Sequence, residues 1–564
     1  MPEALQTSKL SSTLKWTFIL SLVLCIFSLA GFAFTHHADG NGGFHRSGWQ
    51  QNGTGGTEGF RSEPSRWNPD EFSRAFLGAS GFGETNGGQE SRGSSGGRLR
   101  PGDGRGFEGG GLGSMGGGRM SQIPLAEPIA LAAYTALAAV LIGIGWRRLR
   151  SAQPALLAWD SGEGEAANRR HSGRSTLWLM LGSALLLRIA LVPWTTGHNG
   201  DMNYFRSWAT SAAQDFSGFY VHGSADYPPL LIYFLYLIGR AASLPGMEIF
   251  FNTMIKLPSL LADVITGYLI YRLASRHVST RLGFILAAFY AACPAVLVDS
   301  AFWGQVDSFF TLLIVLAVLL ITEGRLTWSA ALFAAAVMMK PQGIIFAPVL
   351  FFEWVRLRSV KKAAAGMLTA AAVVVLLILP FSSGQDPLWI VKLFQRTIGE
   401  YPYASVNADN FFSLIGANHK DSSSVFILFS YQTWGWIFIV LTTAYSWLIY
   451  SRIRSREAAF LAALFQIAGV FTFSTSMHER YLFPAVALAI CAYLYFKDKR
   501  LLGVAAGFSF TVFANTFSVL YGATGRTGTP SYTYSLMFVS LINVLLVLWL
   551  AVIMWQLAFR TSRE

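Results

Sequence analysis

Long apolar segments joined by short polar loops limit how this chain can fold more than any other feature. A helix needs about 20 mostly apolar residues to cross the hydrocarbon core of a bilayer. Only 13% of the residues are charged, roughly half the share found in a soluble domain. The sequence therefore predicts an all-α, polytopic membrane protein with about fourteen transmembrane helices, of which the short pair 326–340 and 343–355 could form one broken hairpin. The predicted spans are residues 16–34, 125–146, 176–195, 255–273, 281–298, 305–322, 326–340, 343–355, 362–380, 431–450, 457–474, 482–496, 501–520 and 534–557.

The chain carries a formal net charge of +12, and its Lys and Arg residues cluster in short loops. Such clusters are typical of cytoplasmic loops, so the charge indicates membrane orientation and no nucleic-acid partner. With the N-terminus inside and the spans alternating, every cluster next to a helix falls on one side. This requires that 227–239 lie in the outer interface; the alternative is an ordinary span over 227–245. The clusters are Arg147–Arg174, Arg272/Arg276/Arg281, Arg325, Arg356/Arg358/Lys361/Lys362, Arg452/Arg454/Arg456, Lys497/Lys499/Arg500 and Arg560/Arg563.

Residues 37–124 differ in composition from the rest of the chain. They contain 26 of the 55 glycines, with few aliphatic residues. Such a segment buries too little apolar area to offset its ordering entropy, so we expect it to be disordered. The preceding segment 16–34 lacks a good cleavage site and is interpreted as an uncleaved signal anchor. The cysteines Cys25, Cys293 and Cys491 lie in apolar runs, where packing roles are expected and neither a disulfide nor a metal site.

A small acidic turn, "HNGD" (198–201), follows the span 176–195. Behind Asp201, apolar residues recur at helical spacing, which predicts an amphipathic helix in the outer interface with Asp201 near its N-terminus. The Asn-Gly pair before Asp201 favours a tight turn that can aim its side chain. A second interfacial helix is predicted to begin at Pro228 and Pro229, because proline suits the first turn of a helix.

Polar clusters from distant parts of the chain all fall on the predicted outer side, whereas the inner loops are only basic. Charges at membrane depth are costly and are functional by default. The clusters combine carboxylates with cations. A cation can hold a lipid phosphate while a carboxylate takes a proton from an attacking hydroxyl, so the clusters predict a site for chemistry on a lipid phosphate. The clusters are Asp201, Asp226–Pro229, Phe302–Asp307, Lys340–Gln342, Asn407–Asn410 and His478–Pro484.

Each cluster also has a purely structural interpretation. Asp201 could cap a helix, and Lys340 could extend toward lipid headgroups. The stretch 478–480 could be a self-satisfied charged turn, and "FWGQ" could be an aromatic turn at the membrane surface. Asp263 could be the partner of Lys256 on the same helix. The gathering of all six clusters on one side favours a common site.

The motifs resemble those of the GT-C superfamily of integral-membrane glycosyltransferases. "DYPPL" (226–230), "LADVITGYLIY" (261–271), "FWGQVDSFF" (302–310) and "MMKPQ" (338–342) follow the order seen in polyprenyl-phosphate-sugar enzymes, and "HERYLFP" (478–484) resembles their late His-Glu motif. The similar groups are the lipid-linked glucosyltransferases of the N-glycan pathway and the mannosyltransferases that add the second mannose of GPI anchors, with their bacterial relatives. The similarity covers 176–500. The first two spans and the Gly-rich segment lie upstream of the usual core, and the first loop has no Asp-x-Asp, which argues against the metal-dependent oligosaccharyltransferase branch.

The resemblance implies a GT-C-like bundle with amphipathic helices in the first outer loop of the core, and an inverting hexosyltransferase. The position of Asp201 matches the catalytic base of the superfamily. The donor would be mannose or glucose on a polyprenyl phosphate, and the acceptor a hydroxyl of a glycan, lipid or protein at the extracytoplasmic face of a bacterial plasma membrane; no cofactor or metal is expected. Lys340, Arg480 and His478 would bind the donor phosphate. The remaining candidate substrate-binding residues are Asp226, Tyr227, Trp303, Gln305, Asp307, Gln342, Asn407, Asn410 and Glu479.

These expectations divide the chain into five parts and leave two other function classes to weigh. A transporter or lipid-linked sugar flippase would place polar residues near the midplane on broken helices, often within inverted repeats; the polar residues here gather at one surface, and we find no internal repeat. A surface scaffold that uses the Gly-rich segment would leave the six clusters unexplained. The parts are a signal-anchor helix (1–36), a Gly-rich extracytoplasmic segment (37–124), a second helix with a basic cytoplasmic loop (125–175), a catalytic membrane core (176–500) and C-terminal spans (501–564).

Overall fold

A computed structural model describes residues 17–33, 166–223, 225–522 and 534–560, together with single positions at 15, 127, 129 and 131. Within these residues the regular elements are helices apart from one antiparallel hairpin, β1–β2. The segment 37–124, predicted to be disordered, lies outside the described residues, as does nearly all of the predicted span 125–146.

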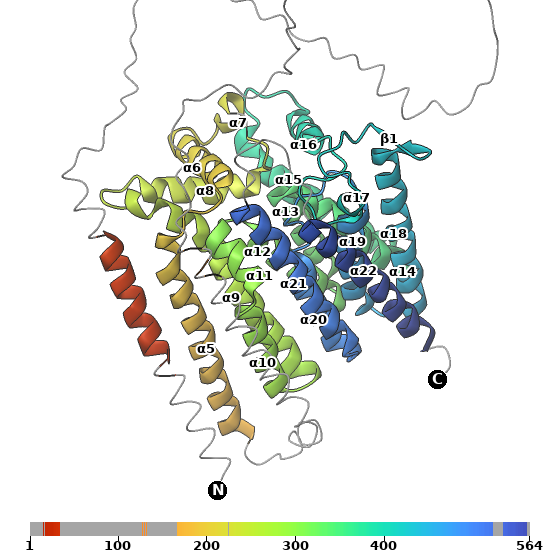
Figure 1. The fold of residues 1–564 in the computed structure, drawn as a ribbon, viewed down its shortest axis with the longest axis horizontal. Coiled ribbons are helices and arrows are strands. Elements are labelled where there is room, and N and C mark those ends of the chain that lie inside the picture. Colours follow the sequence, from red (N-terminus) through yellow and green to blue (C-terminus); the bar gives the residue numbers. More distant parts are fainter. Residues whose placement is uncertain are drawn as a thin grey trace, which may run out of the picture. The chain divides into compact units, whose positions relative to one another are not determined.

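A helix occupies every predicted span that falls within the described residues (Figure 1). The span predicted at 281–298 is divided, because Cys293 and Pro294 interrupt it and start a second short helix. The long elements are Thr17–Ala33, α5 (Ala166–Leu191), α9 (Phe251–His277), α10 (Thr280–Ala291), α12 (Asp307–Thr322), α13 (Leu326–Met339), α14 (Ala347–Leu357), α15 (Val360–Ile378), α18 (Tyr431–Ile453), α19 (Ala458–Phe473), α20 (Pro484–Phe496), α21 (Arg500–Tyr521) and α22 (Tyr534–Arg560).

Shorter elements connect the long helices and carry most of the polar clusters. They are η2 (Val192–Trp194), α6 (Asn199–Gln214), α7 (Phe219–His222), α8 (Pro229–Ala242), η3 (Glu248–Phe250), α11 (Pro294–Leu297), η4 (Val298–Trp303), η5 (Pro341–Phe346), η6 (Leu379–Phe381), α16 (Trp389–Gly399), α17 (Phe411–Leu414), β1 (Val425–Phe426) and β2 (Phe429–Ser430).

The lengths and composition of the helices identify an integral membrane protein. Among the described residues, six helices are long and apolar enough to cross a membrane, and a pair bent by 44° would add a seventh. Other apolar helices are shorter, so the total of about fourteen spans remains a prediction. The six are Ser175–Trp194, Glu248–His277, Val360–Phe381, Tyr431–Ile453, Arg500–Tyr521 and Tyr534–Phe559, and the bent pair is Thr280–Ala291 with Pro294–Trp303.

Helices α19 and α20 form the centre of the bundle. Nearly every side chain of both helices is buried, including residues on all sides of α20. A helix that is apolar all round belongs inside a protein and not at its surface. These two helices pack against each other and against α9, α12, α18, α21 and α22. They therefore hold the loop between them, 474–483, inside one end of the bundle.

The two ends of the bundle differ in their polar groups. Helices α6 and α8 pack together at one end (Figure 1); α8 has 14 residues, fewer than the roughly 20 needed to span a bilayer. At the other end, buried Glu353 accepts two hydrogen bonds from Arg356 (2.7 and 2.8 Å) and one from the Tyr450 hydroxyl (2.7 Å), and lies 3.3 Å from Arg456. That α6 and α8 lie in the membrane interface remains a prediction.

The suggested pairing of Lys256 with Asp263 is wrong. Nζ of Lys256 donates to Oγ1 of Thr195 (2.8 Å) and to the backbone oxygen of Ala301 (2.9 Å). Asp263 Oδ2 instead lies 3.6 Å from Nε of Arg188 on α5. Lys256 and Asp263 are seven residues apart on α9, which corresponds to about 10 Å along the helix. The partners of each residue on neighbouring elements are closer than that.

Candidate active site

Asp201 lies in the first turn of α6 as predicted, but the Asn-Gly pair expected to form a tight turn before the helix is part of that helical turn. Helix α6 starts at Asn199, and His198 caps it by accepting a hydrogen bond at Nδ1 from the backbone nitrogen of Asp201. The amide dipoles at a helix N-terminus favour a negative charge there. The local structure therefore supports an ionised carboxylate at Asp201.

The turn that carries Asp201 packs directly against the turn that carries Trp303. The backbone nitrogen of His198 donates to the backbone oxygen of Trp303 (3.0 Å), and the two rings stack with centroids 4.7 Å apart. Gly304 has φ +89°, and a Cβ there would lie 2.6 Å from Sδ of Met202. Only glycine combines this backbone conformation with so close an approach. Lys256 holds both turns through its bonds to Thr195 and Ala301 described above.

One oxygen of Asp201 collects most of the polar contacts of its carboxylate. Oδ2 accepts hydrogen bonds from Nε1 of Trp303 (2.5 Å), Nε2 of Gln305 (2.7 Å) and Nη1 of Arg480 (3.3 Å). Trp303 and Gln305 are both buried. Oδ1 has no hydrogen bond to any described residue, and the Asp201 side chain is 24% exposed. The carboxylate is thus fixed at one oxygen and open at the other.

Opposing effects act on the pKa of Asp201. Burial raises the pKa. The charge of Arg480 and the polar contacts of His198 and Trp303 lower it by a larger amount, so the pKa lies well below its usual range. An opposite charge within about 4–6 Å favours the ionised form of a carboxyl. Asp201 is therefore a carboxylate at neutral pH in this structure.

Arg480 connects Asp201 to the other charged residues of the site. Nη1 also contacts Oε1 of Glu479 (2.6 Å), Nε lies 3.6 Å from Oδ2 of Asp307, and the guanidinium lies 4.5 Å from the centre of the Trp303 ring. No described residue forms a hydrogen bond with Nε of Arg480. The guanidinium thus lies beside three carboxylates, and its Nη1 makes the hydrogen bonds to Asp201 and Glu479.

Lys340 is buried and forms an ion pair with Asp307. Its ammonium group also lies 4.8 Å from the centre of the Tyr481 ring. The sequence predicts Lys340 and Arg480 as cations that bind the donor phosphate. In the structure both side chains contact carboxylates of the protein. The signal that could have indicated this is the carboxylate content of the same motifs, since Asp307 lies in "FWGQVD" and Glu479 next to Arg480.

His478 differs from the other two residues expected to bind phosphate. Burial, with the charges of Arg480 and Lys340, lowers the pKa of His478 to about 3. The ring is therefore neutral at neutral pH and can contribute a hydrogen bond but no charge. It packs edge-on against Tyr401, with centroids 4.6 Å apart.

Several predicted substrate-binding residues hold loops of the protein in place. Gln342 donates from Nε2 to the backbone oxygen of Tyr481 (2.6 Å). Asn410 caps α17 through Ser413, and Oδ1 of Asn407 accepts from Asn418 (3.2 Å). The backbone of Asn407 forms a bridge to that of His478. These contacts bring the loop of Asn407 and Asn410 to the 478–480 turn.

Asp226 and Tyr227 lie beside the cluster, at the start of α8. The Tyr227 ring packs against the rings of Phe205 and Trp208 on α6, with centroids 5.9 and 5.7 Å apart. Asp226 interacts with Glu400 in the loop 381–430, a residue that no sequence motif indicated. Burial, followed by the negative charge of Glu400, raises the pKa of Asp226 to about 7.

The Asp226–Glu400 pair predicts a pH-dependent stability. The pKa of an unfolded Asp is about 3.9, so the folded protein holds this proton more tightly. The stabilisation is complete below about pH 4 and is lost as the pH rises through about 7. We expect Glu400→Gln to reduce the fall in Tm between about pH 5 and 8, measured by thermal unfolding in nanodiscs. Exposed Glu248→Gln is the matched control, and an unchanged slope in Glu400→Gln would contradict the pairing.

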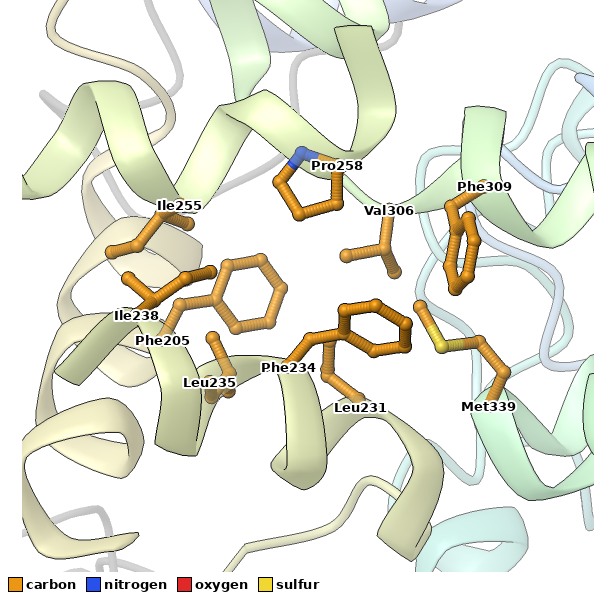
Figure 2. Close-up of a pocket in the computed structure, with 10 residues that line it drawn as sticks. All are labelled: Phe205, Leu231, Phe234, Leu235, Ile238, Ile255, Pro258, Val306, Phe309 and Met339. Carbon is orange, nitrogen blue, oxygen red and sulfur yellow. The ribbon is translucent and has the colours of Figure 1, made fainter. Parts of the chain in front are cut away.

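An apolar layer lies behind the charged cluster. Figure 2 shows side chains from α6, α8, α9, α12 and α13 that converge around a space of about 10 Å³. Such a space holds about one water molecule. Val306 and Met339 line it, and they are the sequence neighbours of Asp307 and Lys340. The layer fixes the backbone that carries the charged pair.

The described residues contain no group of three or more His, Cys, Asp or Glu side chains arranged to hold a metal ion. What the arrangement offers chemically is a carboxylate held at Oδ2, with no hydrogen bond from a described residue to Oδ1, next to a guanidinium. These groups can accept a proton and bind an anion.

The chain matches the model of a family described as dolichyl-phosphate-mannose-protein mannosyltransferase over residues 226–383. The match supports the resemblance to GT-C glycosyltransferases and indicates an enzyme that uses a polyprenyl-phosphate-linked sugar. It includes Asp226, Trp303, Gln305, Asp307 and Lys340, and ends before the 478–480 turn. Comparison with curated proteins gives no match.

Proposed function

We propose that this protein is an inverting glycosyltransferase that moves mannose or glucose from a polyprenyl-phosphate donor to an acceptor hydroxyl at the extracytoplasmic membrane face. The observation that carries the proposal is the contact of Asp201 with Arg480. A candidate base with a free oxygen lies 3.3 Å from a candidate phosphate-binding cation. The family match over 226–383 supports the class of donor.

In the proposed reaction, Asp201 is the general base. The acceptor hydroxyl donates to Oδ1 and loses its proton to it as the acceptor oxygen bonds to the anomeric carbon. Trp303 and Gln305 hold Oδ2 and so orient the carboxylate. General-base catalysis contributes roughly 100- to 10,000-fold in rate.

The bond between the anomeric carbon and the donor phosphate breaks in the same step, and polyprenyl phosphate leaves with the electron pair. Arg480 stabilises the added negative charge through its guanidinium, and Lys340 pairs with Asp307, which also lies beside Arg480. A positioned donor of this kind is worth about 3–4 kcal/mol in the transition state. Because attack and departure occur on opposite sides of the anomeric carbon, the configuration inverts.

The direct test uses purified protein in nanodiscs with a short-chain polyprenyl-phosphate mannose or glucose. Extracted cell-envelope glycans and lipids supply the acceptor. The expected result is release of polyprenyl phosphate with a glycosylated product of inverted anomeric configuration, detected by mass spectrometry and NMR. Donor that stays intact with both sugars and all acceptor fractions would contradict the proposal.

The proposed membrane orientation has its own test. Exposed Ser383 lies in the loop before α16, and exposed Arg358 in the basic turn after α14. The positive-inside rule places the two on opposite sides. We expect Ser383→Cys to react with an impermeant maleimide in intact cells, and Arg358→Cys to react only after permeabilisation. Labelling of Arg358→Cys from outside would reverse the orientation.

A transporter or lipid-linked sugar flippase is the alternative, and the bent pair α10 with α11–η4 favours it. This pair carries Asp299, whose carboxylate is buried and has no hydrogen bond to a described residue. Broken helices with buried charges are common in transporters. Movement of intact donor across proteoliposome membranes, without release of polyprenyl phosphate, would favour this function.

A further inference from the structure

The hairpin β1–β2 presents apolar side chains to its surroundings. Exposure reaches 73% for Val425, 74% for Ile427, 74% for Leu428 and 45% for Phe429. A run of exposed apolar residues is unfavourable in water and marks a contact with a partner or a membrane. The hairpin therefore differs from an ordinary solvent-exposed loop.

The backbone of the hairpin turn adds a second observation. Ile427 has φ +63°, a conformation that is rare for a β-branched residue. A two-residue hairpin turn with positive φ only at its first central residue usually has Gly there, which adopts this conformation at little cost. This turn has Ile427 in that position. The turn combines backbone strain with exposed apolar side chains. An apolar environment around the tip would account for this combination.

The hairpin is firmly attached to the beginning of α18. The Phe426 ring stacks on Tyr431, with centroids 5.4 Å apart, and Nε1 of Trp434 donates to the backbone oxygen of Phe426 (2.9 Å). The Ser430 hydroxyl caps α18 by accepting from the backbone nitrogen of Thr433 (3.1 Å). The position of α18 in a bilayer therefore determines where the tip lies.

The apolar surface of the hairpin continues onto α18. Residues 431–453 form one of the helices able to cross a membrane. Its exposed side chains Trp436 and Val440 line a shallow groove of about 350 Å³ below the hairpin. In Figure 1 the hairpin extends sideways from the end of α18, away from the other helices. Aromatic residues at the end of a span are typical of the membrane interface.

We propose that the β1–β2 hairpin is a membrane anchor that inserts Ile427 and Leu428 into the leaflet at this end of the bundle. The occupant of this surface is lipid, because the hairpin continues the lipid-facing surface of α18. Amphipathic segments bind at this depth by burying apolar side chains at the boundary between headgroups and acyl chains.

The anchor also fixes the loop that reaches the candidate active site. The backbone nitrogens of Tyr431 and Gln432 donate to the backbone oxygens of Ser424 and Ser422 (3.0 and 2.9 Å). Earlier in this loop, the backbone nitrogen of Val406 donates to the backbone oxygen of Met477 (3.0 Å). Insertion of the tip thus sets the height of this loop above the bilayer, whatever reaction the site performs.

The test places an environment-sensitive fluorophore on Leu428→Cys in nanodiscs that hold one protein each. The native cysteines are buried, and exposed Ser423→Cys is the matched control on the same loop. We expect blue-shifted NBD emission at 428 and strong quenching by nitroxide lipids but weak quenching by iodide. The control should show the reverse. Equal iodide quenching at both positions would overturn the anchor, and a blue shift that appears only at high protein density in vesicles would assign the tip to a second copy.

A second variant separates insertion from folding. The double substitution Ile427→Gly, Leu428→Asn places Gly at the residue with positive φ and removes the apolar tip. We expect Val425→Cys carrying NBD to lose most of its nitroxide quenching in this background, while the unfolding temperature in detergent stays equal or rises. Retained quenching at 425 would show that the tip does not drive insertion.

Discussion

Asp201→Asn should lower glycosyl transfer by roughly 100- to 10,000-fold, the range of general-base contributions. The amide keeps the shape of the carboxylate, and its oxygen can still accept hydrogen bonds from Trp303 and Gln305 at the position of Oδ2. It cannot take a proton from the acceptor. Because only the base is lost, donor affinity should not fall and Tm should change little. The measurement is single-turnover transfer at saturating donor.

Asp215→Asn is the matched control, because Asp215 is an exposed carboxylate at the other end of the same helix. It should retain near-full transfer. Asp226 is the rival base, and its raised pKa would suit a proton acceptor near neutral pH. If Asp201→Asn retains near-full transfer and Asp226→Asn abolishes it, the base is Asp226.

Arg480→Gln should weaken donor binding and lower transfer by roughly 100- to 1,000-fold, the loss seen when one transition-state donor is removed. The amide removes the positive charge that we assign to phosphate binding. It also leaves Glu479 buried without its closest cation, which typically costs about 3–5 kcal/mol of stability. Donor affinity is measured by titrating short-chain polyprenyl phosphate, and stability by thermal unfolding.

A second substitution separates these two effects. In Arg480→Gln with Glu479→Gln, the unpaired carboxylate is gone, so Tm should recover while donor binding stays weak. Lys392→Gln, an exposed cation paired with Asp386, is the control and should bind donor normally. Recovery of donor affinity together with Tm would mean that Arg480 supports the fold and that the phosphate lies elsewhere.

The sequence predicts the helices well because their apolar segments are long and their ends carry clear signals. Helix α8 begins at Pro229, where the two prolines predict a helix start. The break between α10 and α11 was not predicted, because the residues on both sides of Pro294 are equally apolar. Periodicity cannot distinguish a straight apolar helix from two short ones in such a run.

The candidate site is harder to predict, because its contacts depend on how distant turns meet. The sequence indicates that Asp201, Trp303 and Arg480 lie at one end of the protein. It does not reveal that Trp303 and Gln305 donate to Asp201, since this requires the close approach of two turns at Gly304. The failed Lys256–Asp263 pairing has the same origin, because partners on other elements are closer.

In the proposed reaction, the 3.3 Å contact of Arg480 with Asp201 couples proton binding to phosphate binding. If a phosphate draws Arg480 away from Asp201, the carboxylate loses the cation that holds its pKa down, so its proton affinity rises as the donor binds. Linkage is reciprocal. Protonation of Asp201 therefore raises the affinity of Arg480 for the phosphate by the same factor by which phosphate binding raises the proton affinity of Asp201. The affinity of Arg480 for the phosphate is highest just after transfer, when the proton is on Asp201 and polyprenyl phosphate is still bound. Release of polyprenyl phosphate then follows the loss of that proton from Asp201. In this scheme, turnover at low pH is limited by dissociation of polyprenyl phosphate.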